Sequence, residues 1–320
     1  MFTHKFGQAQ VPPPASTSRR SLTVRSRGQK QQAVFSLRAS RYGAPYLGVR
    51  PPNTERMNHK QLLGHLAAGE LPTAMALDVS RLASWAMLGA KPRPHNEVQS
   101  EVVNKFFRRW NCVFKASTDE VTDNYRDKAW IISATTLHKF GFIHPECTER
   151  ALQAIDKLNN LVALSDYFFA HAEQAKHLLR SPPSPLKRRP SIPDDVTFFR
   201  KSDVVSYQLD GSYYVCYVQD VQLGNAAPLI EFFNIKLSRP PTMDDISGAH
   251  AVGGRYNDGV RRIEMYWVYG MRSNPDLANQ FKLIQAGCNT PPLQTQLAPP
   301  VGGGSVIDIF KLQDAVDRSF

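Results

Sequence analysis

The sequence predicts an α+β protein, in which an N-terminal all-α helical bundle is followed by a C-terminal antiparallel β-sheet or small open barrel with one or two helices. Apolar residues recur about every 3.6 positions within residues 57–180, which is typical of amphipathic helices. After residue 197 they recur at every second position, as strands require. An Asp-Gly pair at 210–211 lies between two apolar runs and predicts a tight hairpin.

Composition divides the 320 residues into four segments. We expect a disordered basic tail over 1–56, a helical domain over 57–180, a proline-rich linker over 181–196 and a β-rich domain over 197–320. The tail holds ten Lys and Arg against one acid, so it carries most of the net charge of +11. Because the rest of the chain is nearly neutral, the charge does not by itself indicate a DNA-binding domain. Three interpretations of the tail compete: an inert leader, a transit peptide and an arm that binds nucleic acid. We favour the inert leader.

In the helical domain, the clearest predicted helix spans residues 95–116. Large apolar side chains recur there every four positions, at Val98, Val102, Phe106, Trp110 and Phe114. Thr118-Asp119 is expected to cap a helix over 121–140, and two more helices are expected over 145–161 and 162–179. Such stripes predict a bundle of five or six helices that bury them against one another.

Two patterns in this half are compatible with a functional site. A pair of arginines at 108–109 stands between two aromatic residues and could contact nucleic acid, but a solvated face beside a core stripe is the commoner meaning. His144 precedes Cys147 by three residues, without a metal-ligand spacing, an orienting residue or an oxyanion donor. We therefore predict no catalytic residue, no metal site and no cofactor.

The β-rich half contains strand-like runs at 203–209, 212–222, 228–237 and 262–269, with a capped turn at 242–246. Several runs carry apolar or aromatic residues on both faces, so the sheet should be covered on both sides or curled into a barrel. Helices are expected over 276–286 and 306–316.

A resemblance arises within this half. Asp203 opens the first run, Asp210-Gly211 forms the turn, and residues 228–234 read Pro-Leu-Ile-Glu-Phe-Phe-Asn. In this order the segment resembles the start of the bacterial immunity protein 26 family, with Ser202 where that family usually has Gly and Asn234 where it usually has Asp. The resemblance covers about 40 residues. It implies a small β-rich domain that binds and neutralises a toxin and has no chemistry of its own.

Other observations limit the classes of function. The sequence contains no GxSxG, Walker, HExxH or DxD motif. No apolar run approaches the roughly 18 residues that a membrane-spanning helix needs, so we expect no membrane partner. The four cysteines lie far apart, which favours buried free thiols and a reducing compartment such as the cytoplasm.

We therefore expect a cytoplasmic, non-enzymatic binding protein related to immunity or defence, whose β domain holds a protein partner such as a toxin. Exposed carboxylates beside aromatic anchors would suit a basic toxin. The candidate partner-binding residues are Tyr213, Tyr217, Asp220, Asp244, Asp245, Arg255 and Tyr256. The alternative is a nucleic-acid-binding regulator that uses residues 1–56 and the helical domain.

Overall fold

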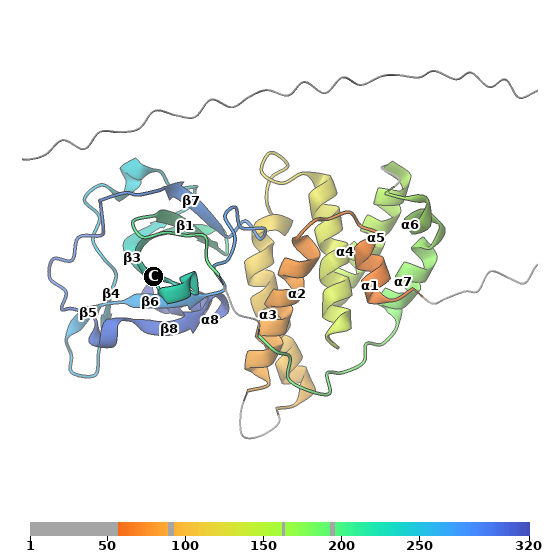
Figure 1. Ribbon diagram of the computed structural model, residues 1–320, viewed down its shortest axis with the longest axis horizontal. Coiled ribbons are helices and arrows are strands. Elements are labelled where there is room, and N and C mark those ends of the chain that lie inside the picture. The colour runs from red at the N-terminus through yellow and green to blue at the C-terminus, as the bar shows by residue number, and fades with distance from the viewer. Residues whose placement is uncertain (1–56, 89–92, 162–163, 193–195) are drawn as a thin grey trace, which may run out of the picture. The chain divides into compact units, whose positions relative to one another are not determined.

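The computed structural model describes residues 57–320 except 89–92, 162–163 and 193–195 (Figure 1). Helices occupy the chain up to Arg180, and a mostly antiparallel mixed sheet and a final helix follow. This order confirms the predicted α+β class. The tail over residues 1–56, for which the composition predicts disorder, lies outside the described residues.

The helical part consists of α1 (His59–Gly64), α2 (Leu71–Ala86), α3 (His95–Phe114), α4 (Asp123–Lys139), α5 (Pro145–Leu161), α6 (Asp166–Ala170) and α7 (Ala172–Arg180). The apolar stripe of α3 is buried, as its period of about 3.6 predicts. The predicted cap at Thr118-Asp119 is wrong, because the side chain of Thr122 accepts the hydrogen bond from the Tyr125 amide at the start of α4. The helix predicted over 162–179 is two helices that meet at His171, whose ring is hydrogen-bonded to the Tyr167 carbonyl.

The proline-rich segment lies against the helical part. The described residues 181–192 contain neither helix nor strand, as expected for a chain without enough amide donors. Leu186 packs on the core, and the Ser80 hydroxyl donates to the Ser191 carbonyl. Gly141 has a positive φ, and a Cβ there would lie 2.8 Å from the Ser184 carbonyl oxygen. The segment is therefore held at several points on helices α2 and α4.

The main sheet has six strands in the order β7-β1-β2-β3-β6-β8, with β6 and β8 parallel and the other neighbours antiparallel. The strands are β1 (Val204–Leu209), β2 (Ser212–Val221), β3 (Pro228–Leu237), β6 (Met265–Tyr269), β7 (Phe281–Gln285) and β8 (Ser305–Asp308). A separate pair joins β4 (Gly253–Arg255) to β5 (Arg261–Ile263). At the β1–β2 turn, Asp210 and Gly211 both have positive φ values, 49° and 81°, which confirms the predicted hairpin.

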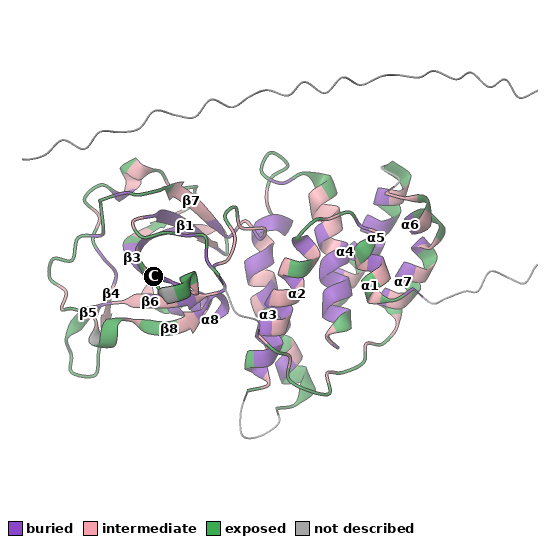
Figure 2. Ribbon diagram, viewed as in Figure 1, coloured by how far each residue is buried: buried purple, intermediate pink, exposed green. Residues whose placement is uncertain are grey.

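Both faces of the sheet are covered, as the bulky side chains on both faces predict (Figure 2). One face joins the main core through Tyr207, Tyr214, Phe232 and helix α8 (Ile309–Ser319). The other face has its own cluster, composed of Val204, Val215, Tyr217, Phe233, Ile246 and Cys288. All four cysteines are free and buried, which confirms that prediction.

Two predicted helices near the C-terminus are wrong or shifted. Residues 276–286 form a turn and strand β7, because the Asp276 carboxylate accepts from the amides of Ala278, Gln280 and Phe281 and these bonds hold a turn instead of a helix. The helix expected over 306–316 begins only at Ile309. Residues 305–308 pair with β6 as a strand, and Asp308 then caps α8.

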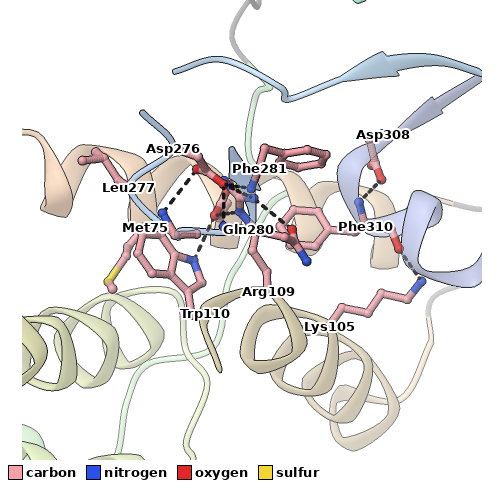
Figure 3. A network of polar contacts seen from close by, with 12 residues as sticks. Met75, Lys105, Arg109, Trp110, Asp276, Leu277, Gln280, Phe281, Asp308 and Phe310 are labelled. Carbon is pink, nitrogen blue, oxygen red and sulfur yellow. Dashed lines mark hydrogen bonds and ion pairs between the residues drawn. The ribbon is translucent and has the colours of Figure 1, made fainter. Parts of the chain in front are cut away.

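A buried polar network joins the two parts of the chain (Figure 3). The guanidinium of Arg109 on α3 contacts Asp276 Oδ1 at 2.7 Å, Asp78 Oδ2 at 2.9 Å and Gln280 Oε1 at 3.0 Å. Asp78 also accepts from the indole of Trp110. Around it, one apolar cluster runs from α1 to α8, and the described residues from Met57 to Phe320 form one compact unit. Independent folding of the helical and β parts stays a prediction.

Candidate binding groove

A hollow lies between helix α3, helix α4 and the start of α5. It has a volume of about 840 Å³, within the range of sites that take small ligands or segments of larger ones. We call it the groove, and it is lined by Val103, Asn104, Phe107, Arg108, Asn111, Phe114, Lys115, Arg126, Trp130, His144, Glu146 and Arg150. Helix α3 contributes about half of these residues at spacings of three and four, because such positions share one face.

Aromatic rings form one wall of the groove. Trp130 stacks on Phe114 with ring centroids 3.7 Å apart and an interplanar angle of 15°. Phe107 lies about two helical turns before Phe114, and the centroids of the Phe107 and His144 rings are 4.6 Å apart. Phe107, Trp130 and His144 remain partly exposed. The wall therefore offers aromatic surface that the core has not fully covered.

Basic side chains border the aromatic wall, but they differ in how firmly they are engaged. Arg108 is held by Asp210 and Asp317, and Arg126 donates to the carbonyls that end α3 and lead to α4. Lys115 and Arg150 are exposed, and neither forms an ion pair or side-chain hydrogen bond within the described part of the chain. These two cations are therefore available to an anion.

A second hollow of about 380 Å³ continues from the groove toward the β1–β2 hairpin. It shares Arg108, Asn111 and Lys115 with the groove, and on the β side it is lined by Gln208, Asp210, Gly211, Tyr213 and Ser238. Arg108 bridges the two hollows, because its guanidinium binds Asp210 Oδ2 on the hairpin and Asp317 on α8. We call this second hollow the hairpin hollow.

The arginine pair considered above divides between two environments. Arg108 lines the groove, whereas Arg109 is buried in the network of Figure 3. Successive helical residues point about 100° apart, so neighbours in sequence need not share a face. Burial disfavours the charge of Arg109, but Asp276 and Asp78 outweigh it and raise the pKa of the guanidinium. Both the favoured solvated face and the alternative nucleic-acid contact are therefore wrong for Arg109, which joins α3 to the β part.

The structure places the two candidate tyrosines of β2 in different environments. Tyr213 lines the hairpin hollow and is thus close to the groove. Tyr217 lies in the outer core, where its hydroxyl contacts Ser202 Oγ and the Cys288 carbonyl at 3.0 Å. Asp220 is exposed near the far end of β2, about 23 Å along the strand from Tyr213.

The remaining candidates lie in loops beyond β3. Asp244 is exposed, whereas Asp245 accepts from the Thr242 amide and binds Arg239, and these contacts lower the pKa of Asp245. Arg255 and Tyr256 are exposed at the β4–β5 hairpin, where the Arg262 guanidinium lies 5.8 Å from the Tyr256 ring. Of all seven candidates, only Tyr213 lines the groove or the hairpin hollow.

The His144–Cys147 pair does not have the geometry of a nucleophile and its base. His144 Nδ1 accepts from the backbone amide of Cys147, whereas the thiol lies near the Trp130 carbonyl. Burial raises the pKa of the Cys147 thiol far above its ordinary value, so the reactive thiolate is disfavoured. Among the described residues, no group of three or more His, Cys, Asp or Glu side chains is arranged to hold a metal ion.

Sequence reasoning missed the most informative residues of the groove. The sequence pattern predicts that Trp130 is buried in the core and that Lys115 faces solvent. The pattern of a single helix does not show which neighbouring element covers each of its faces. The available signal was the spacing of Phe107, Phe114 and Lys115 along one side of α3.

Three comparisons add no relative to this description: no protein-family model, no curated protein and no solved structure matches the chain. The resemblance to the immunity protein family stays a prediction. Of the described helices, none is both long and apolar enough to cross a membrane.

Proposed function

We propose that this chain is a non-enzymatic binding protein that holds an anionic partner in the groove. The observation that carries the proposal is the pair of unengaged cations, Lys115 and Arg150, beside a partly exposed aromatic wall. A cation that lacks an internal partner can pair with a ligand without first breaking an ion pair, and aromatic residues are enriched among those that dominate binding energy.

The distribution of carboxylates supports an anionic partner over a basic one. Six acids of the β part bind cations within the chain: Asp210 and Asp317 bind Arg108, Asp276 binds Arg109, Asp314 binds Lys105, Asp245 binds Arg239, and Asp258 binds Arg262. A carboxylate already paired with arginine has less to offer a basic toxin. Arg108 is engaged as well, which is why the proposal depends on Lys115 and Arg150.

The test measures binding of two labelled polyanions, an oligo-glutamate peptide and a single-stranded oligonucleotide, to the full chain by fluorescence anisotropy. We expect at least one probe to bind, with an affinity that falls as salt rises, and the double variant Lys115→Glu/Arg150→Glu to bind it at least tenfold more weakly. Both residues are exposed, so the fold should tolerate the change.

The matched control is Lys187→Glu/Arg188→Glu, which makes the same charge change at two exposed residues that line neither hollow. The control should bind like the natural chain. Equal weakening by the control and by the groove variant, or no binding of either polyanion, would contradict the proposal.

A second proposal keeps the toxin-binding function that the resemblance of residues 201–237 implies, with the chain acting in the bacterial cytoplasm. Its support is that Asp220 and Asp244 are exposed and make no ion pair within the described residues. The product of a neighbouring toxin gene is the probe. Binding that survives Lys115→Glu/Arg150→Glu and is lost in Asp220→Lys/Asp244→Lys would favour this proposal over the groove.

A further inference from the structure

We infer that the ligand of the groove is a single-stranded nucleic acid, with a base against the aromatic wall and phosphates on Lys115 and Arg150. The inference rests on the proposed function and names the class of the anionic partner. It draws on the composition of the groove, which combines partly exposed rings, free cations and side-chain amides.

The aromatic wall favours a ligand with flat faces. Trp130 is already stacked on Phe114, an arrangement that fixes the indole ring and leaves it partly exposed in the groove. A fixed ring loses little entropy when a second flat group stacks on it. An acidic peptide would satisfy the cations but has no planar group that repeats with its charges, whereas each nucleotide supplies one base and one phosphate.

The polar groups of the groove fit the same ligand. Asn104 and Asn111 lie on α3 seven residues apart, so they share its groove face, and each amide offers both a donor and an acceptor for a base edge. Glu146 is the only acid among the groove's lining residues. The same lining includes four cations, namely Arg108, Lys115, Arg126 and Arg150. Two of these cations are engaged within the chain. Because cations still outnumber acids in the lining, the electrostatic potential of the groove favours a negatively charged phosphate.

A single strand is favoured over a duplex because paired bases are stacked on one another and hide their faces. Proteins that bind single strands combine a cationic track with aromatic platforms, and this pairing tolerates different bases. The hairpin hollow adds no further cation, and its lining includes the acids Glu120 and Asp210. The phosphates of a strand are therefore expected in the groove itself, at Lys115 and Arg150.

The experiment titrates the full chain with a labelled dT12 single strand, the same length of duplex, a single strand with abasic sites and the oligo-glutamate peptide. We expect the normal single strand to bind best, and its affinity to fall with salt. Each lost phosphate contact should reduce the slope of log K against log salt by about 0.7. Trp130→Leu should weaken dT12 binding by about 5- to 150-fold, the range measured for one stacked base.

Because Trp130 packs on Phe114, a second variant guards against misfolding. Trp130→Phe keeps a ring at the site, and the difference in tryptophan fluorescence between this variant and the natural chain reports Trp130 alone. We expect dT12 to quench that difference signal and the abasic strand not to quench it.

The outcomes separate this inference from the proposed function. If the peptide binds through Lys115 and Arg150 while dT12 does not, the nucleic-acid inference is overturned and the anionic partner stands. If neither binds, both fail. If dT12 binds but neither the groove variants nor the fluorescence respond, the strand binds elsewhere, for instance through residues 1–56, and both proposals fail.

Discussion

At the scale of single residues, the structure shows that neighbours of the same type have different tasks. Arg108 and Arg109 are adjacent, yet one lines the groove and the other is buried between two carboxylates. Tyr213 and Tyr217 belong to one strand, yet one borders the hairpin hollow and the other belongs to the outer core. Residue type alone therefore does not locate a site in this chain.

Burial of Glu231 on β3 makes the stability of the fold depend on pH. It is fully buried among strands, where it accepts from Gln219 and, at 3.2 Å, from Gln294. Burial disfavours the charged form and raises the pKa of Glu231, although both amides oppose this. The folded chain thus holds a proton here more tightly than the unfolded chain, and stability falls as pH rises through and above the ordinary pKa of a glutamate.

We therefore expect the stability of Glu231→Gln, relative to the natural chain, to improve as pH rises from 4 to 7. The difference in the free energy of unfolding between the variant and the natural chain has a part that does not change with pH, which reflects the changed hydrogen bonds. Only the part that changes with pH reports the protonation of the carboxylate. Urea denaturation at the two pH values measures it, with Glu149→Gln on the exposed side of α5 as control. A difference that stays constant, or moves the other way, would show that Glu231 is not held in its protonated form.

At the scale of elements, local signals succeeded where the sequence itself supplies the partner. The Asp210-Gly211 turn, the stripe of α3 and the capped turn at 242–246 all formed as predicted. Predictions failed at the Thr118-Asp119 cap, in the helix over 162–179, in the helix over 276–286 and at residues 305–308. Pairing with a distant strand explains residues 305–308, whereas the Asp276 turn competes with the helical pattern from within five residues. A local signal therefore predicted an element only where no other partner, near or distant, competed with it.

The β1–β2 turn gives a matched pair of variants. Gly211 has φ 81°, whereas Gly64 lies in helix α1, and a Cβ at either position would meet no atom within 4 Å. Gly211→Ala should therefore destabilise the chain by about 1 kcal/mol through backbone strain alone. Gly64→Ala should leave stability unchanged or raise it by up to about 1 kcal/mol. Thermal unfolding checks both, and equal shifts would contradict the turn conformation.

At the scale of the whole molecule, α3 connects the helical part to the sheet. Its three basic residues Lys105, Arg108 and Arg109 bind Asp210, Asp276, Asp314 and Asp317, all of which belong to the β part. Each half is nearly neutral in sequence, so its net charge gives no sign of this complementarity. The groove is lined by helical residues alone, whereas the hairpin hollow beside it lies at this contact and includes residues of both parts.

Replacement of Arg109 tests whether the two parts unfold together. Arg109→Met leaves Asp78 and Asp276 buried without their cation, and we expect a loss of about 3–5 kcal/mol in the free energy of unfolding. Far-UV circular dichroism and tryptophan fluorescence should report one coincident transition. The exposed pair of Arg239 and Asp245 provides the control, since Arg239→Met should change little. Separate transitions for the two signals would support independently folding domains.

The fold class, most helices, the main hairpins and the burial of the cysteines follow from the amino-acid sequence, because they depend on periodicity and on turn residues close together in the chain. Which charges are neutralised and which face a groove depends on packing between distant segments, since Arg109 meets Asp276 across 167 positions and Trp130 meets Phe114 only when α3 and α4 pack. Side-chain identity sets what a residue can bind, whereas its distant neighbours decide whether it is still free to do so.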